Sequence, residues 1–349
     1  MKKYFLVFFG IILFFFIACG DKKKSEPSKI DSTLYDYKKS ELKTEPIDDK
    51  SVFNLSYRFD NEKNLLYRLV TISESEQKIT ADTIISNKLK QELVYLIEFK
   101  PKTKEADGTV EADVKIVGLK LNANFNGQNI TFDSKDKNDT NKVKQFAEFA
   151  SLVDNPFSIR FSKVGEISEI FRIDKIANSF FKLKNADTVD TETKNMVKEE
   201  LSTNVLRPIA GQLIRKFTDK NLSKDSSWSI PQSPIPMMVY KINYTNKYKI
   251  SSLEKFKDRK LAVIDAGIDF KVEGNNKYSD SGVDYVFSTP VYKGEGKIYF
   301  DISNGRIQRS HTKSSNSFSF TMTTNTPEGK KKAKREESNN ITNILELID

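Results

Sequence analysis

The chain has 349 residues, of which 38% are hydrophobic and 30% charged, a balance that allows a sizeable folded core. Most of its formal net charge of +9 comes from Lys2, Lys3 and a basic cluster made of Lys330, Lys331, Lys332, Lys334 and Arg335, so the remainder is close to neutral. The basic cluster has no interleaved aromatic residues for stacking bases, which argues against a nucleic-acid partner, and the single cysteine and single histidine exclude internal disulfides and His/Cys metal sites.

The N-terminus has the pattern of a bacterial secretion signal. A short cationic start precedes an apolar run at residues 4–17, and the small residue Ala18 precedes Cys19. The run is shorter than the about 20 apolar residues of a membrane-spanning helix. Its end, Phe16-Ile17-Ala18-Cys19, resembles the lipobox of bacterial lipoproteins, in which the cysteine becomes the acylated first residue of the mature chain. The resemblance implies a signal peptide at residues 1–18 and a lipid anchor on Cys19.

Residues 19–50 are expected to connect the anchor to the folded domain. After the cysteine they are mostly Lys, Glu, Asp, Ser and Pro, a composition that buries too little apolar surface to fold by itself. The segment therefore predicts a flexible tether. A coil of this length holds a domain a few tens of Å from its anchor, at about 5–6 Å times the square root of the residue number.

Residues 51–135 predict long antiparallel strands. Apolar residues alternate with polar ones at residues 53–59, which gives one buried face with a period of two. Between residues 110 and 125 the apolar positions change from even to odd numbers, and such a slip requires a β-bulge near Val117-Gly118. Asn126-Gly127 then predicts a tight turn.

Residues 139–220 predict a helical middle. Apolar residues recur at helical spacing at residues 143–153, 176–183 and 196–217, with Asp139 or Thr140 as the cap of the first helix and a break before Pro208 in the last. Residues 157–161 revert to a strand pattern. The centre of the chain is therefore expected to be a helical insertion between two sets of strands.

Residues 236–325 return to strand patterns, with Asn304-Gly305 as a strong hairpin signal. Residues 326–349 predict a basic linker followed by an amphipathic helix, because Ile341, Ile344, Leu345 and Ile348 fall on one helical face. Strands, helices and strands without regular alternation predict an α+β fold. We expect residues 51–325 to form an extended, curved antiparallel sheet with the helical insertion packed on one face.

Signals for catalysis or metal binding are weak. His311 stands beside Ser310, but no Gly-x-Ser-x-Gly motif accompanies them, which favours a structural histidine. The stretch Asp136–Thr140 has oxygen ligands at alternate positions, yet it lacks the Gly and Glu of a calcium loop, so helix capping explains it better. Gly294 and Gly296 lack the spacing of a phosphate loop and predict a turn between strands.

Four aspartates remain as candidate acids. Asp265 and Asp269 fall on one face of a predicted strand, and Asp284 and Asp301 are expected on neighbouring strands. General acid-base catalysis requires two carboxylates that converge in a cleft. Their spacing along the sequence does not establish such convergence, so we expect no catalytic residue, no metal and no cofactor.

Several features together resemble a family of uncharacterised bacterial envelope lipoproteins with a domain of unknown function. They are the lipobox, the long strand patterns, the helical middle, the segment at Trp228 and the hairpin at Phe300-Asp301 and Gly305. In that family a Gly-Asp pair often precedes the tryptophan, whereas Ser226-Ser227 stand here. The resemblance covers about residues 50–325, implies secretion and a common fold, and carries over no catalytic residues.

Two classes of function follow. The first is a non-enzymatic lipoprotein that binds an apolar ligand such as a lipid acyl chain, or that acts as an envelope scaffold with a protein partner. The second is an envelope hydrolase with converging carboxylates or a Ser/His pair. An assembly factor would instead expose an apolar patch. We expect the first class, attached by acylated Cys19 to the outer membrane at its periplasmic face or to the cell surface rather than to the inner membrane.

Overall fold

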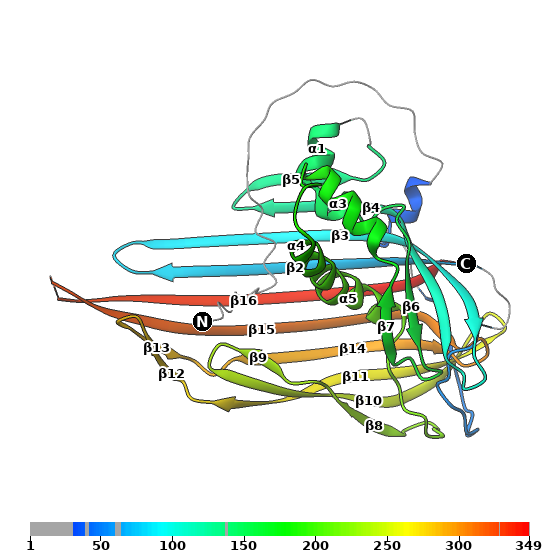
Figure 1. Ribbon diagram of the computed structural model, residues 1–349. Helices are drawn as coiled ribbons and strands as arrows, with labels where there is room; N and C mark the ends of the chain where they lie inside the picture. The colour runs from blue at the N-terminus through cyan, green and yellow to red at the C-terminus, as the bar shows by residue number, and fades with distance from the viewer. Residues whose placement is uncertain (1–30, 39–41, 60–63, 137–138, 328, 349) are drawn as a thin grey trace.

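The computed structural model describes residues 31–38, 42–59, 64–136, 139–327 and 329–348 (Figure 1). Its main element is one 16-stranded antiparallel sheet. Across the sheet the strands follow the order β1 (Glu45–Ile47), β10 (Tyr240–Phe256), β11 (Arg259–Gly274), β14 (Val291–Asp301), β15 (Arg306–Thr326), β16 (Gly329–Ile348), β2 (Leu65–Thr80), β3 (Ile84–Lys104), β4 (Val110–Phe125), β6 (Phe157–Phe161) and β7 (Ile167–Phe171).

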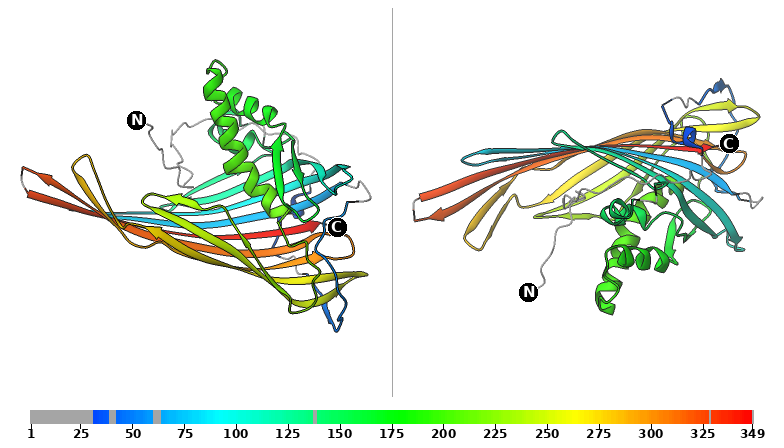
Figure 2. Two further views of the ribbon diagram at one scale, coloured as in Figure 1. Left: turned by 60° about the horizontal axis from the view of Figure 1, so that its bottom comes forward. Right: turned by 90° about the horizontal axis from the view of Figure 1, so that it is seen from above.

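The other strands pair with members of this series. They are β5 (Gln128–Asp133) beside β4, β8 (Ser227–Pro231) and β9 (Ile235–Met237) beside β10, β13 (Val283–Phe287) beside β15, and β12 (Lys277–Asp280) beside β13. The helical elements are the 3-10 turn η1 (Ser32–Tyr35), α1 (Thr140–Gln145), α2 (Ala147–Ala150), α3 (Asp174–Leu183), α4 (Thr191–Glu200), the π-helical η2 (Leu201–Leu206) and α5 (Arg207–Leu213). The helices from α3 to α5 lie together on one face of the sheet (Figure 2).

The prediction of an α+β fold is wrong. Strands account for 57% of the structure and helices for only 15%, so the protein is a mostly β protein with a small helical part. The strand predicted at residues 157–161 is β6, which joins the sheet beside β4, and β7 follows beside β6, so the helical part of the middle is small. The last helix does not break before Pro208, because the π-helical turn η2 leads directly into α5.

The predicted basic linker and C-terminal helix form one strand, β16, between β15 and β2. Leu345 and Leu347 belong to the main core, whereas Ile344 and Ile348 pack in a second cluster on the other face. A strand covered on both faces has apolar residues in succession. That pattern imitates the i, i+3, i+4, i+7 spacing of an amphipathic helix.

Different elements pack on the two faces of the sheet. The helix-side face carries α3–α5 and most of the core, and the outer face carries η1 (Figure 2). Tyr35 of η1 packs against Val70, Val94 and Leu96, and Arg68 donates to the carbonyls of Leu34 at 2.8 Å and Asp36 at 3.0 Å. The described part of the predicted tether is therefore packed on the sheet.

Several local predictions are confirmed. Leu96 pairs with Gly118 and Ile97 with Ile116, so the bulge lies at Val117. Asn126-Gly127 joins β4 to β5, and Asn304-Gly305 lies in the turn between β14 and β15. The carboxylate of Asp139 accepts a hydrogen bond from the amide of Lys142 at 2.9 Å and caps α1.

The turn predicted at Gly294 and Gly296 is wrong, because both residues lie inside β14. A Cβ at Gly296 would lie 2.5 Å from Thr312 Cγ2 on the neighbouring strand β15. A Cβ at Gly294 would lie 2.4 Å from Ile268 Cδ1 on β11. These glycines give room to cross-strand side chains. In the part of the chain that the structure describes, every helix is too short or too polar to cross a membrane.

Candidate functional site

The four candidate carboxylates bind different partners and do not converge. Asp265 forms an ion pair with Lys297 at 3.7 Å, and Asp269 forms one with Lys247. Asp284 accepts a hydrogen bond from the Ser279 hydroxyl at 2.6 Å. These three aspartates lie on strands whose exposed faces are rich in charged residues. Each is therefore a partner in a local surface contact.

Asp301 has a structural environment at the end of β14. Its side chain is fully buried and accepts hydrogen bonds from the backbone amide and side-chain amide of Asn304 at 2.9 and 2.8 Å. Arg259 lies 3.6 Å away and also donates to Gln308 at 2.9 Å. This buried polar group stabilises the turn between β14 and β15, and the Asp301 carboxylate is not exposed to solvent.

Ser310 and His311 point to opposite faces of β15, as successive residues of a strand do. Ser310 is fully buried and pairs with Ile298, whereas His311 is exposed on the outer face and pairs with Lys297. Burial, together with the charges of Lys313 and Arg309, lowers the pKa of His311. The structure does not bring this Ser and His together as a catalytic pair.

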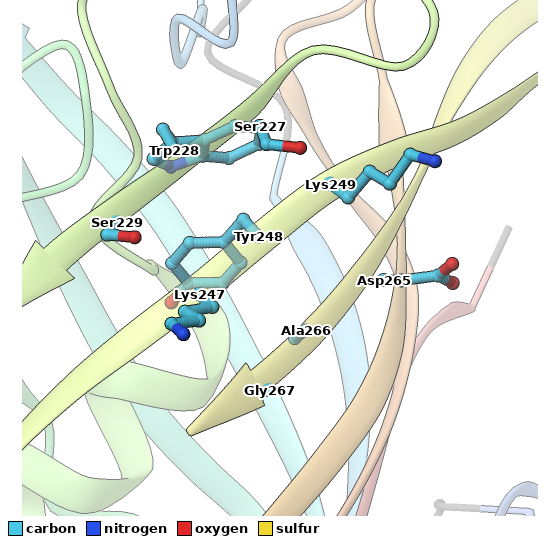
Figure 3. Close-up of a pocket in the computed structure, with 9 residues that line it drawn as sticks. All are labelled: Ser227, Trp228, Ser229, Lys247, Tyr248, Lys249, Asp265, Ala266 and Gly267. Atoms are coloured by element: carbon cyan, nitrogen blue, oxygen red, sulfur yellow. The ribbon is translucent and has the colours of Figure 1, made fainter. Parts of the chain in front are cut away.

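Two surface depressions of about 380 Å³ each share Asp265 and Ala266 in their linings. Figure 3 shows one of them, in which Lys249 and Asp265 point away from the rings of Trp228 and Tyr248. Lys249 is held by Asp225 at 3.0 Å. Paired charges of this kind form a solvated surface. The described residues also contain no group of three or more His, Cys, Asp or Glu residues placed to hold a metal ion.

An aromatic cluster, two of whose members also line the depression of Figure 3, packs against the helix-side core. Trp228 of β8 stacks on Tyr248 of β10 with ring centroids 5.2 Å apart. Phe217, which follows α5, meets the Trp228 ring at 6.5 Å and the Phe300 ring at 5.4 Å. Tyr57 lies 6.1 Å from Phe217. These five residues define what we call the Trp228 cluster.

Two buried nitrogen donors at the Trp228 cluster lack a hydrogen-bond acceptor. The Tyr57 hydroxyl accepts from the Arg215 amide at 2.8 Å and donates to the Arg215 carbonyl at 3.2 Å, and the Arg215 guanidinium donates to Gln212 at 2.5 Å. The Nε atom of Arg215 and the Nε1 atom of Trp228 are buried without a hydrogen-bond partner. Burial of a donor without an acceptor costs about 1–3 kcal/mol.

Electrostatics distinguish Arg215 from the surface arginines. Burial lowers the pKa of its guanidinium, and only Tyr248 and Tyr57 oppose this effect. Burial also raises the pKa of Tyr248. Arg160 and Arg172, by contrast, pair with glutamates. An acceptor oxygen of a carboxylate, phosphate or ester would suit the donors of Arg215 and Trp228.

Sequence reasoning singled out Trp228 but missed Arg215. The available signal was an arginine among Leu213, Ile214 and Phe217, just after the end of α5. Cys19, the predicted lipidation site, lies outside the described residues.

Comparisons with solved structures give weak likenesses. A lipovitellin structure on lipid-protein interactions matches with a TM-score of 0.39 and 11% identity, and the match covers 82% of this chain and 25% of that chain. This chain thus spans about a quarter of the length of that protein. OccK5 (OpdH) of Pseudomonas aeruginosa follows with a TM-score of 0.19, 5% identity, and coverage of 81% and 98%. The COG4313 outer membrane channel of Pseudomonas putida F1 has a TM-score of 0.15, 9% identity, and coverage of 84% and 98%.

These likenesses are too weak to indicate a function. No curated protein matches the sequence. The resemblance to a domain of unknown function is confirmed, although over a shorter range than expected. Residues 107–307 match the model of a family of unknown function, DUF6263, and because this match spans more than half of the chain, the protein belongs to that family.

Proposed function

We propose that this protein is a lipid-anchored protein of the bacterial cell envelope that binds an amphipathic ligand at the Trp228 cluster and catalyses no reaction. One observation carries the proposal: the buried donors of Arg215 and Trp228 lack acceptors and are surrounded by aromatic rings. Such a site suits an apolar body with an oxygen-bearing head. The ligand class is a lipid with a carboxylate or phosphate group.

The distribution of the carboxylates supports binding over hydrolysis. A glycosidase or acid-base hydrolase requires two acids that flank the reacting bond. Asp301 is enclosed by Asn304 and Arg259, and Asp265 is paired with Lys297 on the opposite face from the Trp228 cluster. A guanidinium and an indole can orient an anionic head, but neither is a suitable general base at neutral pH.

We expect a lipid ligand to change the fluorescence of Trp228, the only tryptophan in the chain. Oleate and a lysophosphatidylglycerol are suitable probes, because they carry the two candidate head groups on a similar apolar body. Titration should shift the emission, and Arg215→Gln should weaken binding about tenfold, since a hydrogen bond to a charged group contributes about 1.5–3 kcal/mol.

Arg207→Gln is the matched control, because Arg207 is exposed on α5 and its guanidinium only donates to the Ile167 carbonyl at 3.2 Å. Its affinity should equal that of the wild type. A titration without any change in emission, or an equal loss of affinity in both variants, would contradict binding at the Trp228 cluster. A preference for one probe would identify the head group.

Acylation of Cys19 is tested separately by intact mass and by partition into detergent. The native protein should carry the mass of its acyl chains and enter the detergent phase, whereas Cys19→Ala should do neither. The reason is that each buried methylene contributes about 0.8 kcal/mol, so several chains on one residue give a lasting anchor. An unmodified native protein in the aqueous phase would refute the anchor but leave ligand binding open. An acylated protein without bound lipid would favour an envelope scaffold.

A further inference from the structure

Three hairpin tips lie at the same end of the sheet, away from η1 and on the left in Figure 1. They join β2 to β3, β12 to β13, and β15 to β16. The register places them near one another, because Lys334 pairs with Thr80 and Thr324 pairs with Val283. We call these three tips the distal end.

The distal end exposes large apolar side chains. Ile84 and Ile85, at the tip between β2 and β3, are 65% and 53% exposed. Tyr278 of β12 and Val286 of β13 are 49% and 46% exposed. These four are among the ten large apolar side chains that are exposed in the described part of the chain, and they lie in the two tips that flank the tip between β15 and β16. An apolar partner would remove this surface from water.

The third tip is cationic. The basic cluster forms the start of β16, and the facing strand β15 contains no acidic residue over its whole length, from 306 to 326. Lys334 and Arg335 pair with Glu336 and Glu337. Lys330, Lys331 and Lys332, which are all exposed, extend beyond the end of β2. The tip therefore presents positive charge next to exposed apolar residues.

We propose that the distal end docks on the surface of an anionic lipid bilayer. Lysines attract the phosphates of anionic headgroups, and apolar or aromatic side chains enter the boundary between headgroups and acyl chains. The two features lie at the same end of one sheet, in adjacent hairpins. A bilayer satisfies both, because it offers negative charge at its surface and an apolar layer directly beneath.

The chain length allows the anchor and the distal end to reach the same membrane. Tyr35 packs on Val70, and β2 continues from there to Thr80, a distance of about 33 Å at 3.3 Å per residue. From Cys19 to Asp31 the chain can extend at most about 40 Å. This second membrane contact goes beyond the proposed function and does not depend on acylation.

Vesicle flotation tests the docking without the anchor. The chain from residue 19 onward, with Cys19→Ser, keeps every residue that the structure describes. It should float with phosphatidylcholine vesicles that contain phosphatidylglycerol, bind much less to pure phosphatidylcholine, and dissociate as salt is added. The double variants Ile84→Ser/Ile85→Ser and Lys330→Gln/Lys332→Gln should each weaken binding about tenfold or more.

Matched controls remove equivalent groups elsewhere. Val52→Ser/Met196→Ser removes exposed apolar side chains outside the distal end, and Lys175→Gln/Lys182→Gln removes two exposed charges from α3. Both controls should bind like the parent chain, and circular dichroism should show that all variants fold. The proposal would be overturned if the chain did not float with the vesicles, or if the control variants lost as much binding as the test variants. It would also be overturned if the chain bound an acidic protein or a nucleic acid but not the vesicles.

Discussion

The Gly165→Ala variant is expected to lose about 4 kcal/mol of folding free energy. Gly165 has a φ of +86°, where an L-residue is strained, and a Cβ there would lie 2.1 Å from the Arg215 carbonyl oxygen and 2.6 Å from the Tyr57 ring. Backbone strain contributes about 1–3 kcal/mol and overpacking a similar amount. Urea unfolding of wild type and variant measures the loss directly.

This variant should also weaken lipid binding, because the atoms that must move belong to the Trp228 cluster or to its donor. Gly127→Ala is the control. Gly127 has a φ of +90°, but a Cβ there would meet nothing within 4 Å, so only the strain of about 1–2 kcal/mol applies. Equal destabilisation of the two variants would show that the close approach to Arg215 contributes nothing.

Asp301→Ala should cost about 3 kcal/mol or more. The substitution removes a fully buried carboxylate that accepts two hydrogen bonds from Asn304 and lies 3.6 Å from Arg259. Loss of one member of a buried polar group costs more than its contacts contribute, because the remaining groups stay desolvated. The midpoint of urea unfolding should fall while the slope of the transition stays unchanged.

Asp265→Ala provides the comparison for Asp301. Asp265 is half exposed, and its ion pair with Lys297 spans 3.7 Å on the outer face. Exposed ion pairs contribute about 0–1 kcal/mol, so this variant should unfold close to the wild type. Because the Asp265 carboxylate lies on the face opposite the Trp228 cluster, the variant should also bind lipid normally. A large loss of stability at Asp265 and none at Asp301 would contradict the assigned roles.

Features that depend on a few neighbouring residues were predictable. The bulge at Val117 follows from the change of apolar parity in one strand, and Asn126-Gly127 and Asn304-Gly305 have the side chains that tight turns require. The cap at Asp139 depends on an amide three residues away. In each case the deciding contact lies within the local sequence or within one hairpin.

Features that depend on distant strands were not predictable. Residues 329–348 became a strand because β15 and β2 flank them, and the apolar residues on both of its faces look helical in one dimension. Gly294 and Gly296 looked like turn residues, although their role is to make room for Ile268 and Thr312 on adjacent strands. Residues 31–38 looked unable to fold alone, yet they fold against the outer face.

The amino-acid sequence by itself determined the strand and turn periodicity, the near-neutral charge outside Lys2, Lys3 and the basic cluster, and the pattern around Cys19 that implies an anchor. Only the tertiary structure decided the order of the strands in the sheet, that four aspartates stay apart, and that Arg215 lies beside Tyr57 and Tyr248 with its Nε donor unfilled. The physical reason is that periodicity and turn chemistry are local. Burial and charge pairing depend instead on which distant segments share a face of the sheet.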